Sequence, residues 1–374
     1  MEDIYIWGFG YGSEYDEAAK LKVNELVSNG EVGLITTGRI GKLWMSQENK
    51  LIFNRSFMGI ALFLIYSILI LPFRCNMIMI MARLNSPWLF AWTRLLKHKV
   101  IHIFSNEYIH SDISEYPFYF RHVFKYTKCV GITCIREKRI IDQQLPSKDG
   151  QKTVLFLPFV NGMKYYYCDP PNVDTFTITF ASAPMTKSAF DDKGIDLLLK
   201  GFKRFSEAVD AKLIIIWRRE KYTGLLYIME NLIKDYCLEG KVEIINEEIE
   251  DMRSIYAHSH TTILVNRNHN NTPNYPQSLL EALSVGRPVI TSNINEVADI
   301  ILREDVGSIC ELNGDAVYDA MMDCYVNYFR KQTNTKGIAK KYFDLTRTLE
   351  GPMFSEKRLR DQGCVEELRS KWIH

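Results

Sequence analysis

Two lysines in the second half of the chain have the residue type and spacing to bind a phosphorylated ligand. Lys187 and Lys193 lie six residues apart in the segment MTKSAFDDKGIDLLL, where a loop leads into a helix. Two ammonium groups at such a point can neutralise a diphosphate and stabilise the charge that builds on a leaving group. Lysine serves there as a mobile point charge. Lysines are also common on solvated surfaces, so the pair alone leaves both interpretations open.

A second segment, TPNYPQSLLEALSVGRPVI over residues 272–290, predicts a helix that starts near Ser278 and ends at Gly286. The start of a helix presents unpaired N–H groups and the positive end of the helix dipole, which suits a phosphate. Glu281 lies about one turn into this helix. Its two oxygens could accept hydrogen bonds from both hydroxyls of a ribose, or the side chain could simply complement the helix dipole.

The elements that must position these residues alternate between strands and helices. In the first half, the apolar runs predict strands at Ile4–Trp7, Glu31–Thr36, Met77–Met81, Lys99–Phe104, Val130–Cys134 and Val154–Leu157. Beyond a linker at Pro170-Pro171 they predict strands at Phe176–Ser182, Lys212–Trp217, Val242–Ile245, Thr261–Val265 and Pro288–Thr291. Helical patterns stand between them, and this alternation favours parallel sheets covered on both faces.

The sequence therefore predicts an α/β protein with two Rossmann-like domains, over residues 1–170 and 171–345. Ligands of such sheets bind at the carboxyl ends of the strands. Residues 346–374 are more polar and predict a helical tail, which could pack back on the N-terminal domain.

The order of the blocks resembles the retaining GT-B glycosyltransferases that carry a Glu-x7-Glu signature, the glycosyl transferases group 1. KGIDLL at Lys193–Leu198 is similar to the family's KG-x-D-x-L-L block. The run YPQSLLEALSVGRPVI at 275–290 is similar to its signature helix and the strand that follows. The resemblance is specific over about residues 176–312. The first glutamate of the signature would fall at position 273, where this chain has Pro273.

This resemblance implies a GT-B fold, with two parallel sheets facing each other across a cleft. It implies an enzyme that moves a sugar from a nucleoside-diphosphate sugar to a glycan or lipid-linked acceptor, with retention and without a metal, as in cell-surface polysaccharide synthesis. Lys187 and Lys193 would hold the donor diphosphate and Glu281 the ribose. Four residues would cradle the distal phosphate with their backbone: Tyr275, Pro276, Gln277 and Ser278. Pro273 keeps an alternative open, a catalytically silent binding partner in a polysaccharide assembly complex.

In the N-terminal half the resemblance is weak. The turn that holds Gly10 and Gly12 stands where the family has a Gly-Gly loop, so Gly12 is a donor-side candidate and Gly10 an acceptor-side candidate. The same turn loosely suggests a dinucleotide site, although G-x-G-x-x-G is not met. Family members often carry a histidine after a mid-domain strand, and the candidates here are His102, Glu107 and His110. A histidine within an apolar strand such as His102 is more often a core residue than a functional one.

Composition excludes several other classes. Lys and Arg number 46 against 45 Asp and Glu, a net charge of +1, which argues against a nucleic-acid partner. The eight cysteines form no C-x-x-C pair, and no D-x-D occurs, so we expect neither a metal nor a cofactor beyond the sugar nucleotide. The acidic start of the chain lacks the basic region of a signal peptide, which predicts a cytoplasmic protein.

One stretch raises the question of a membrane. Phe57–Leu71 runs for 15 residues without a charge, fewer than the roughly 20 that a spanning helix needs. It predicts either a buried core helix or a helix that rests on a membrane surface. Residues 83–139 add ten Lys and Arg against four acidic residues, with aromatic residues interleaved. This basic segment could contact anionic lipid headgroups on the inner face of the membrane, or be a solvated helix face.

Overall fold

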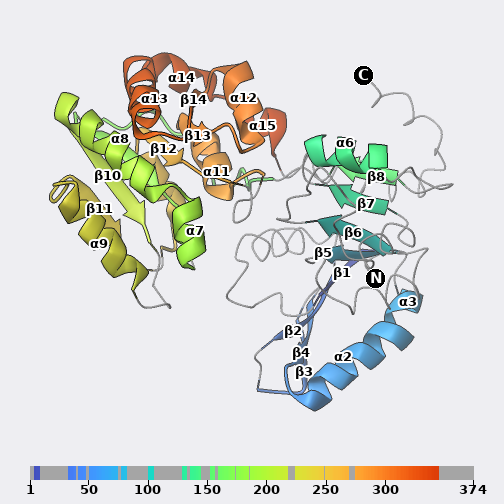
Figure 1. Cartoon of the computed structure of the whole chain (residues 1–374). Coiled ribbons are helices and arrows are strands. Elements are labelled where there is room, and N and C mark those ends of the chain that lie inside the picture. Colours follow the sequence, from blue (N-terminus) through green and yellow to red (C-terminus); the bar gives the residue numbers. More distant parts are fainter. Residues whose placement is uncertain are drawn as a thin grey trace. The chain divides into compact units, whose positions relative to one another are not determined.

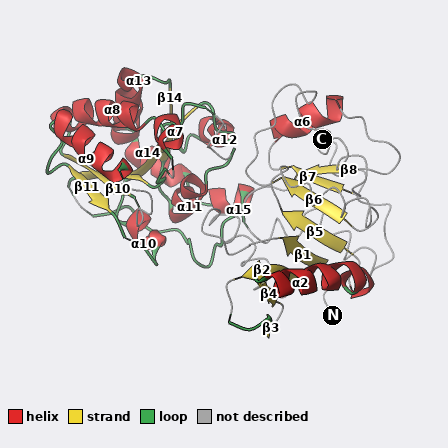
Figure 2. Ribbon diagram, turned by 60° about the horizontal axis from the view of Figure 1, so that its bottom comes forward, coloured by secondary structure: helices red, strands yellow, loops and turns green. Residues whose placement is uncertain are grey.

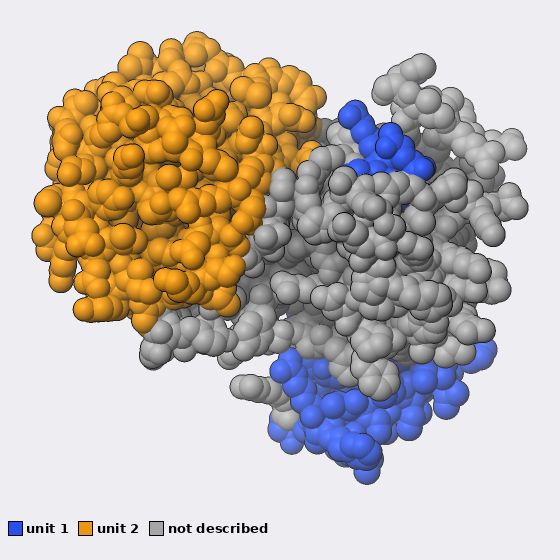
Figure 3. All heavy atoms as spheres, viewed as in Figure 1, with its two compact units in different colours: residues 1–157, 348–374 blue, residues 158–347 orange. Residues whose placement is uncertain are grey.

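The computed structural model divides into two compact units, Met1–Leu157 with Thr348–His374, and Pro158–Arg347 (Figure 3). The residues that it describes are 4–8, 33–38, 41–47, 50–74, 77–81, 100–104, 129–132, 135–144, 152–155, 159–172, 174–184, 186–217, 224–247, 249–268 and 274–344. The second unit begins ahead of the Pro170-Pro171 pair because Phe159, Val160 and Tyr165 are already buried within it. The predicted helical tail lies outside the described residues.

The second unit, which we call unit 2, is built on a six-stranded parallel sheet in the order β11-β10-β9-β12-β13-β14 (Figure 1). Its strands are β9 (Phe176–Phe180), β10 (Ala211–Ile216), β11 (Val242–Ile245), β12 (Thr261–Leu264), β13 (Val289–Ser292) and β14 (Gly307–Cys310). Every residue of β9 and β12 is buried, as expected of central strands covered on both faces. The strand order reverses between these two strands, which is where such sheets bind ligands.

Helices flank this sheet on both sides (Figure 2). They are α7 (Lys187–Asp192), α8 (Ile195–Ala208), α9 (Leu225–Asp235), α10 (Met252–Ala257), α11 (Gln277–Val285), α12 (Val297–Glu304), α13 (Gly314–Val326), α14 (Tyr328–Asn334) and α15 (Ile338–Tyr342). Helix α8 packs against α13, and α10 packs against α11. Helix α8 shows why the sequence folds this way: its apolar residues recur along one face, and Leu198, Phe202 and Phe205 are fully buried.

The first unit, unit 1, holds an eight-stranded sheet in the order β3-β4-β2-β1-β5-β6-β7-β8. Its strands are β1 (Ile4–Gly8), β2 (Gly33–Gly38), β3 (Trp44–Gln47), β4 (Lys50–Asn54), β5 (Met77–Met81), β6 (Val100–Phe104), β7 (Cys129–Ile132) and β8 (Lys152–Leu155). Only the pairing of β3 with β4 is antiparallel among the described strands. The described helices are α2 (Phe57–Leu69), α3 (Leu71–Arg74) and α6 (Ile135–Gln144).

The predicted α/β class is confirmed. Each strand that the sequence predicts is present, and neither of its ends differs from the prediction by more than two residues. The β3–β4 hairpin and β14 were not predicted. The sequence left two interpretations for Phe57–Leu71, and the structure gives a helix that is buried along one side only. The helix expected around residues 14–27 lies outside the described part of the chain.

Candidate functional site

The chain segments that follow the two central strands of unit 2 meet at the point where the strand order reverses. After β12 the chain runs along α7, and the backbone N–H of Arg267 donates to the carbonyl of Asp192 at 2.7 Å. The Arg267 guanidinium also pairs with Asp196 at the start of α8, at 2.5 Å. The segment that carries the predicted lysines is therefore fixed at the carboxyl ends of β9 and β12.

Lys193 ends α7 and is half-buried. Its ammonium donates a hydrogen bond to the hydroxyl of Ser182, which follows β9, at 2.5 Å. Lys187 is the first residue of the same helix and is exposed. The helix rise separates the two lysines by about 9 Å along its axis.

The sharp turn that follows Lys193 requires a glycine. Gly194 has a φ of +60°, and a Cβ built on it would lie 2.2 Å from the carbonyl oxygen of Val265 in the segment after β12. A side chain is excluded by that carbonyl, and the left-handed backbone disfavours one as well. The close approach sets the position of Lys193 against the end of β12.

Glu281 lies in the second turn of α11 and is 7% exposed. The hydroxyl of Tyr256, from α10, lies 3.2 Å from its Oε2 atom and donates to it. Tyr165 and Gln277 also donate side-chain hydrogen bonds to the carboxyl group, and the positive charge of Lys164 acts on it. Burial outweighs these contacts and raises the pKa of Glu281 to about 7, since a carboxylate loses its hydration in such a place.

The start of α11 holds the four residues predicted to cradle a phosphate. Pro276 caps the helix without a side-chain hydrogen bond, and its carbonyl accepts the N–H of Leu279 at 3.0 Å. Gln277 donates its amide hydrogen to the carbonyl of Phe159 at 3.3 Å, while its buried Oε1 atom has no hydrogen-bond partner in the described part of the chain. Tyr275 and Ser278 are half-buried beside it.

Sequence reasoning missed the residues that support Glu281. Arg287 is fully buried; its Nε donates to the carbonyl of Tyr256 at 3.1 Å and its Nη2 to the carbonyl of Asp169 at 2.6 Å. Arg287 thus ties α10 to the segment that precedes β9. In the sequence Gly286-Arg287-Pro288 signals only the end of a helix, and Tyr165 stands more than a hundred residues before Glu281, so no local pattern could reveal this support.

The other predicted residues are not tested by the structure. His102 lies in β6, where its backbone is in register with Ile80 of β5 and Val130 of β7. Four further candidates fall outside the described residues: Gly10, Gly12, Glu107 and His110. Pro273 falls outside them as well.

His260 of unit 2 does not contribute to this site. His260 is buried against the ring of Phe176 and accepts the N–H of Thr177 at 3.0 Å; burial, with the charge of Arg287, lowers its pKa to about 4. Among the described residues, no group of three or more His, Cys, Asp or Glu side chains is placed to hold a metal ion.

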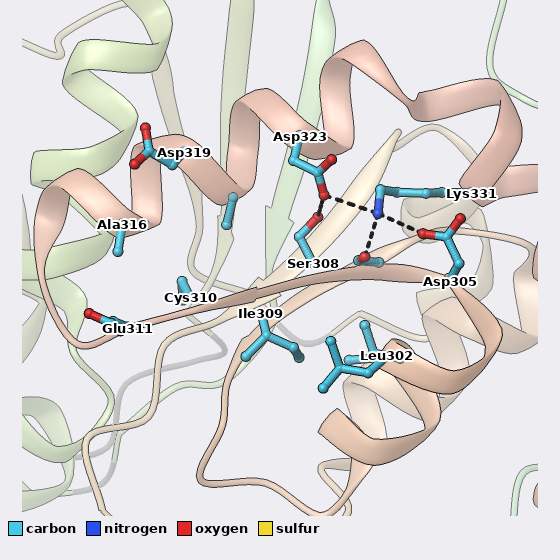
Figure 4. Close-up of a pocket in the computed structure, with 13 residues that line it drawn as sticks. Leu302, Asp305, Ser308, Ile309, Cys310, Glu311, Ala316, Asp319, Asp323 and Lys331 are labelled. Carbon is cyan, nitrogen blue, oxygen red and sulfur yellow. Dashed lines mark hydrogen bonds and ion pairs between the residues drawn. The ribbon is translucent and has the colours of Figure 1, made fainter.

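An open hollow of about 430 Å³ lies along the outer edge of β14, between α12 and α13 (Figure 4). At its end Lys331 is buried and contacts Asp305 and Asp323 at 3.0 Å and the carbonyl of Gly307 at 2.7 Å (Figure 4). The protein itself satisfies this charge, and none of the predicted site residues lines the hollow. We interpret the cluster as a structural ion pair.

Comparison with known proteins agrees with this geometry. The family model "Glycosyl transferases group 1" matches residues 182–335, most of unit 2. The chain is similar in structure to sucrose-phosphate synthase from Thermosynechococcus elongatus, with 12% identity over 97% of this chain and 100% of that one and a TM-score of 0.73. It is also similar to HepE from Anabaena in complex with UDP and glucose, with 12% identity over 96% and 100% of the two chains and a TM-score of 0.71.

A third similar structure is WaaG, a glycosyltransferase involved in lipopolysaccharide biosynthesis, with 10% identity over 90% and 94% of the two chains and a TM-score of 0.60. The sequence matches no curated protein. The fold is GT-B. Together with the matched domain, it defines the class of the protein as a nucleotide-sugar-dependent glycosyltransferase.

Proposed function

We propose that the protein transfers a sugar from a nucleoside-diphosphate sugar to a glycan or lipid-linked acceptor in cell-surface polysaccharide synthesis, with retention of configuration. The observation that carries the proposal is the position of Lys193 and Glu281 on the segments that follow the two central strands of unit 2. The UDP bound by HepE and the lipopolysaccharide role of WaaG support UDP as the first nucleotide to test and a surface glycan as the product class.

In this proposal each part of the donor has its own partner. The hydroxyls of the ribose donate to Glu281, whose carboxylate accepts them beside Tyr256. The diphosphate lies against Lys193, Lys187 and the first turn of α11. Because these groups are positive before the reaction begins, they stabilise the charge that develops as the diphosphate leaves. The chain's own cations then supply the charge that a metal ion would otherwise bring.

The chemical step needs no strong protein base. The bond between the anomeric carbon and the diphosphate oxygen breaks, and the acceptor oxygen bonds to the same face of that carbon. The acceptor's proton passes to the leaving phosphate oxygen. The protein's contribution is to hold the two reactants together and to stabilise the leaving group.

Calorimetric titration tests the donor site. UDP, GDP, TDP and ADP are titrated in the presence of EDTA, and we expect one of them to bind with micromolar affinity. Binding of none would overturn the proposal. Turnover is then measured as release of the nucleoside diphosphate from its sugar conjugate in the presence of a glycan acceptor. Binding without any turnover would favour the silent binding partner.

Two variants separate the two halves of the donor. Lys193→Met is expected to lower the affinity for UDP by about tenfold or more. The affinity for uridine should stay unchanged, because only the charged contact is lost. Glu281→Gln is expected to lower the affinity for both UDP and uridine. Lys234→Met and Glu230→Gln, which change exposed residues of α9, serve as matched controls and should change neither affinity.

A further inference from the structure

Helix α2 of unit 1 is buried along one narrow side only. The buried residues are Gly59, Phe63 and Ser67, which recur every four positions and so form one stripe. This stripe packs on β4, where the ring of Phe53 lies 5.8 Å from that of Phe63 and 5.9 Å from that of Tyr66. Figure 2 shows α2 lying along the part of the sheet that β2 and β4 form.

The remainder of α2 is apolar and exposed. Phe57 at its start is 89% exposed, Leu69 at its end is 62% exposed, and Phe73 of α3 is 88% exposed. More than half of the large apolar side chains that are exposed in the described part of the chain belong to this region. We call them the α2 surface: Leu43, Trp44, Met45, Phe57, Met58, Ile65, Ile68, Leu69, Ile70 and Phe73. Soluble proteins rarely leave a large apolar patch exposed unless something covers it.

The described charged side chains at the edge of the α2 surface are positive. Lys42 and Arg55 are exposed at its end near Phe57, and Lys50 and Arg74 belong to the same stretch of sequence. Residues 50–74 contain no Asp or Glu, and the one acidic residue between positions 41 and 74, Glu48, lies outside the described residues. Exposed cations beside an apolar face complement a surface that is apolar inside and anionic outside, which is the chemistry of an anionic lipid bilayer.

The dimensions favour a helix that lies on a bilayer rather than through it. The 13 residues of α2 extend about 20 Å, whereas the hydrocarbon core of a bilayer is roughly 30 Å thick. None of the helices that the structure describes is long and apolar enough to cross a membrane. Trp44, 55% exposed at the rim of the surface, is a residue that prefers the membrane–water interface.

A second copy of the chain is a poorer occupant. Two-fold self-association brings one patch against the same patch of its partner. The cations Lys42 and Arg55 of both copies would then be gathered at one interface, with no carboxylate from residues 50–74 to compensate them. Such gathering of like charges opposes self-association, whereas the same cations attract anionic headgroups.

We propose that unit 1 docks through the α2 surface onto an anionic lipid bilayer, with α2 parallel to the membrane plane and its apolar face among the acyl chains. The inference deepens the proposed function, on which it rests for its biological use, since a docked enzyme meets a lipid-linked acceptor at the membrane surface. The docking itself requires only the residues of the α2 surface and its cations.

Vesicle co-sedimentation tests the proposal on the full chain. The vesicles are phosphatidylcholine alone, or equal parts of phosphatidylcholine and phosphatidylglycerol. We expect binding to the anionic vesicles that weakens as salt is added, and much less binding to the neutral ones. The triple variant Phe57→Gln/Leu69→Gln/Phe73→Gln should bind the anionic vesicles at least about tenfold more weakly.

A matched triple variant, Leu302→Gln/Val326→Gln/Phe329→Gln, changes three equally exposed apolar residues of unit 2 and should bind like the wild type. Lys42→Gln/Arg55→Gln should lose most of the preference for phosphatidylglycerol. Circular dichroism and UDP titration show whether each variant is folded. They also separate the two proposals, because vesicle binding without UDP binding contradicts the proposed function alone.

Two results would overturn the docking proposal. One is equal binding of both triple variants to anionic vesicles. The other is a wild-type chain that sediments as a dimer without lipid while the α2 triple variant sediments as a monomer, because the α2 surface would then be covered by a second copy.

Discussion

The hydroxyl oxygen of Tyr256 lies 3.2 Å from Oε2 of Glu281, and both side chains are buried. The bond joins α10 to α11. Arg287, just beyond α11, returns to the carbonyl of the same tyrosine at 3.1 Å. The glutamate that we assign to the donor ribose is therefore positioned by residues from two other segments, and its ionisation is linked to the stability of unit 2.

The raised pKa of Glu281 predicts a pH-dependent stability. Burial moves the pKa from 4.5 in the unfolded chain to about 7 in the folded one. Between these values the folded state binds more protons, so this contribution is complete below pH 4.5 and is lost as the pH rises through 7. Glu281→Gln is neutral at every pH, and its unfolding free energy at pH 8 should exceed that of the wild type by up to about 3 kcal/mol.

Urea unfolding at pH 4.5 and pH 8 measures this difference. The two proteins should be nearly equally stable at pH 4.5. Glu230→Gln changes an exposed glutamate of α9 and should follow the wild type at both values. A Glu281→Gln protein that gains nothing at pH 8 would show that the carboxylate is ionised at little cost in the folded chain.

Removal of the Tyr256 hydroxyl should act through Glu281. In Tyr256→Phe the carboxylate loses one donor, so the pKa of Glu281 rises further and its ionised form is destabilised by about 1–3 kcal/mol. We expect the affinity for uridine to fall, and the pH at which this affinity changes to move upward. Tyr227→Phe, on the exposed side of α9, is the matched control. An unchanged pH profile of uridine binding would argue against the assigned role of Glu281.

The sequence predicted β9 to β13 of unit 2 because these strands are short apolar runs between clear helical patterns, whereas the edge strand β14 (Gly307–Cys310) was not predicted. β9, with every residue buried, is such a run. The hairpin of Trp44–Gln47 and Lys50–Asn54 escaped prediction because it mixes polar and apolar residues and buries only Phe53 among the apolar ones.

In helix α2 the hydropathy of the sequence does not predict which side is buried. Its sequence is apolar on all sides, so no periodicity indicates which side is buried. The structure buries Gly59 and Ser67 with Phe63, and it exposes Phe57 and Leu69. Small residues allow the close approach to the sheet: a Cβ on Gly59 would lie 2.2 Å from the carbonyl oxygen of Asn54. Packing distance, which a hydropathy pattern does not record, sets the orientation.

For the site, the sequence predicted the residues that follow the central strands, and their roles toward a ligand stay predictions. Lys193 and Glu281 stand at recognisable positions because the turn after β9 and the start of α11 are local patterns. Tyr165 and Tyr256 contact Glu281 only through the tertiary fold. Their identity gives no signal, since a buried tyrosine is common in any core.

The close approach of Gly194 to Val265 predicts a large effect of a single methyl group. Gly194→Ala must move either the left-handed turn or the carbonyl that lies 2.2 Å from the new Cβ, which should cost about 2–4 kcal/mol of unfolding free energy. Gly337→Ala has a similar positive φ of +86° but no atom within 4 Å, so it should cost only about 1 kcal/mol.

Chemical denaturation of the two variants measures the difference, which isolates the steric overlap from the backbone strain. Because Gly194 follows Lys193 directly, Gly194→Ala should also lower the affinity for UDP, whereas Gly337→Ala should leave it unchanged. Equal stability of the two variants would show that the α7–α8 turn moves away from Val265 at little cost.

The buried Arg287 should stabilise unit 2 far more than an arginine at its surface. Arg287→Met leaves the carbonyls of Tyr256 and Asp169 without their donors in a dry interior, and we expect a loss of about 3 kcal/mol or more. Arg267→Met removes a pair with Asp196 in which both side chains are more than a third exposed, so it should cost at most about 1 kcal/mol.

The pKa of His260 gives an independent measure of the effect of the Arg287 charge. Burial first, and the positive charge of Arg287 second, hold the pKa of His260 at about 4. In Arg287→Met the second cause is gone, so the imidazole should titrate at a higher pH while it stays below 6.5, because the burial persists. Titration of the His260 ring by NMR detects this shift, and Arg267→Met should leave it unchanged. An unaltered His260 titration in a folded Arg287→Met protein would mean that the guanidinium charge is already neutralised by the carbonyls around it.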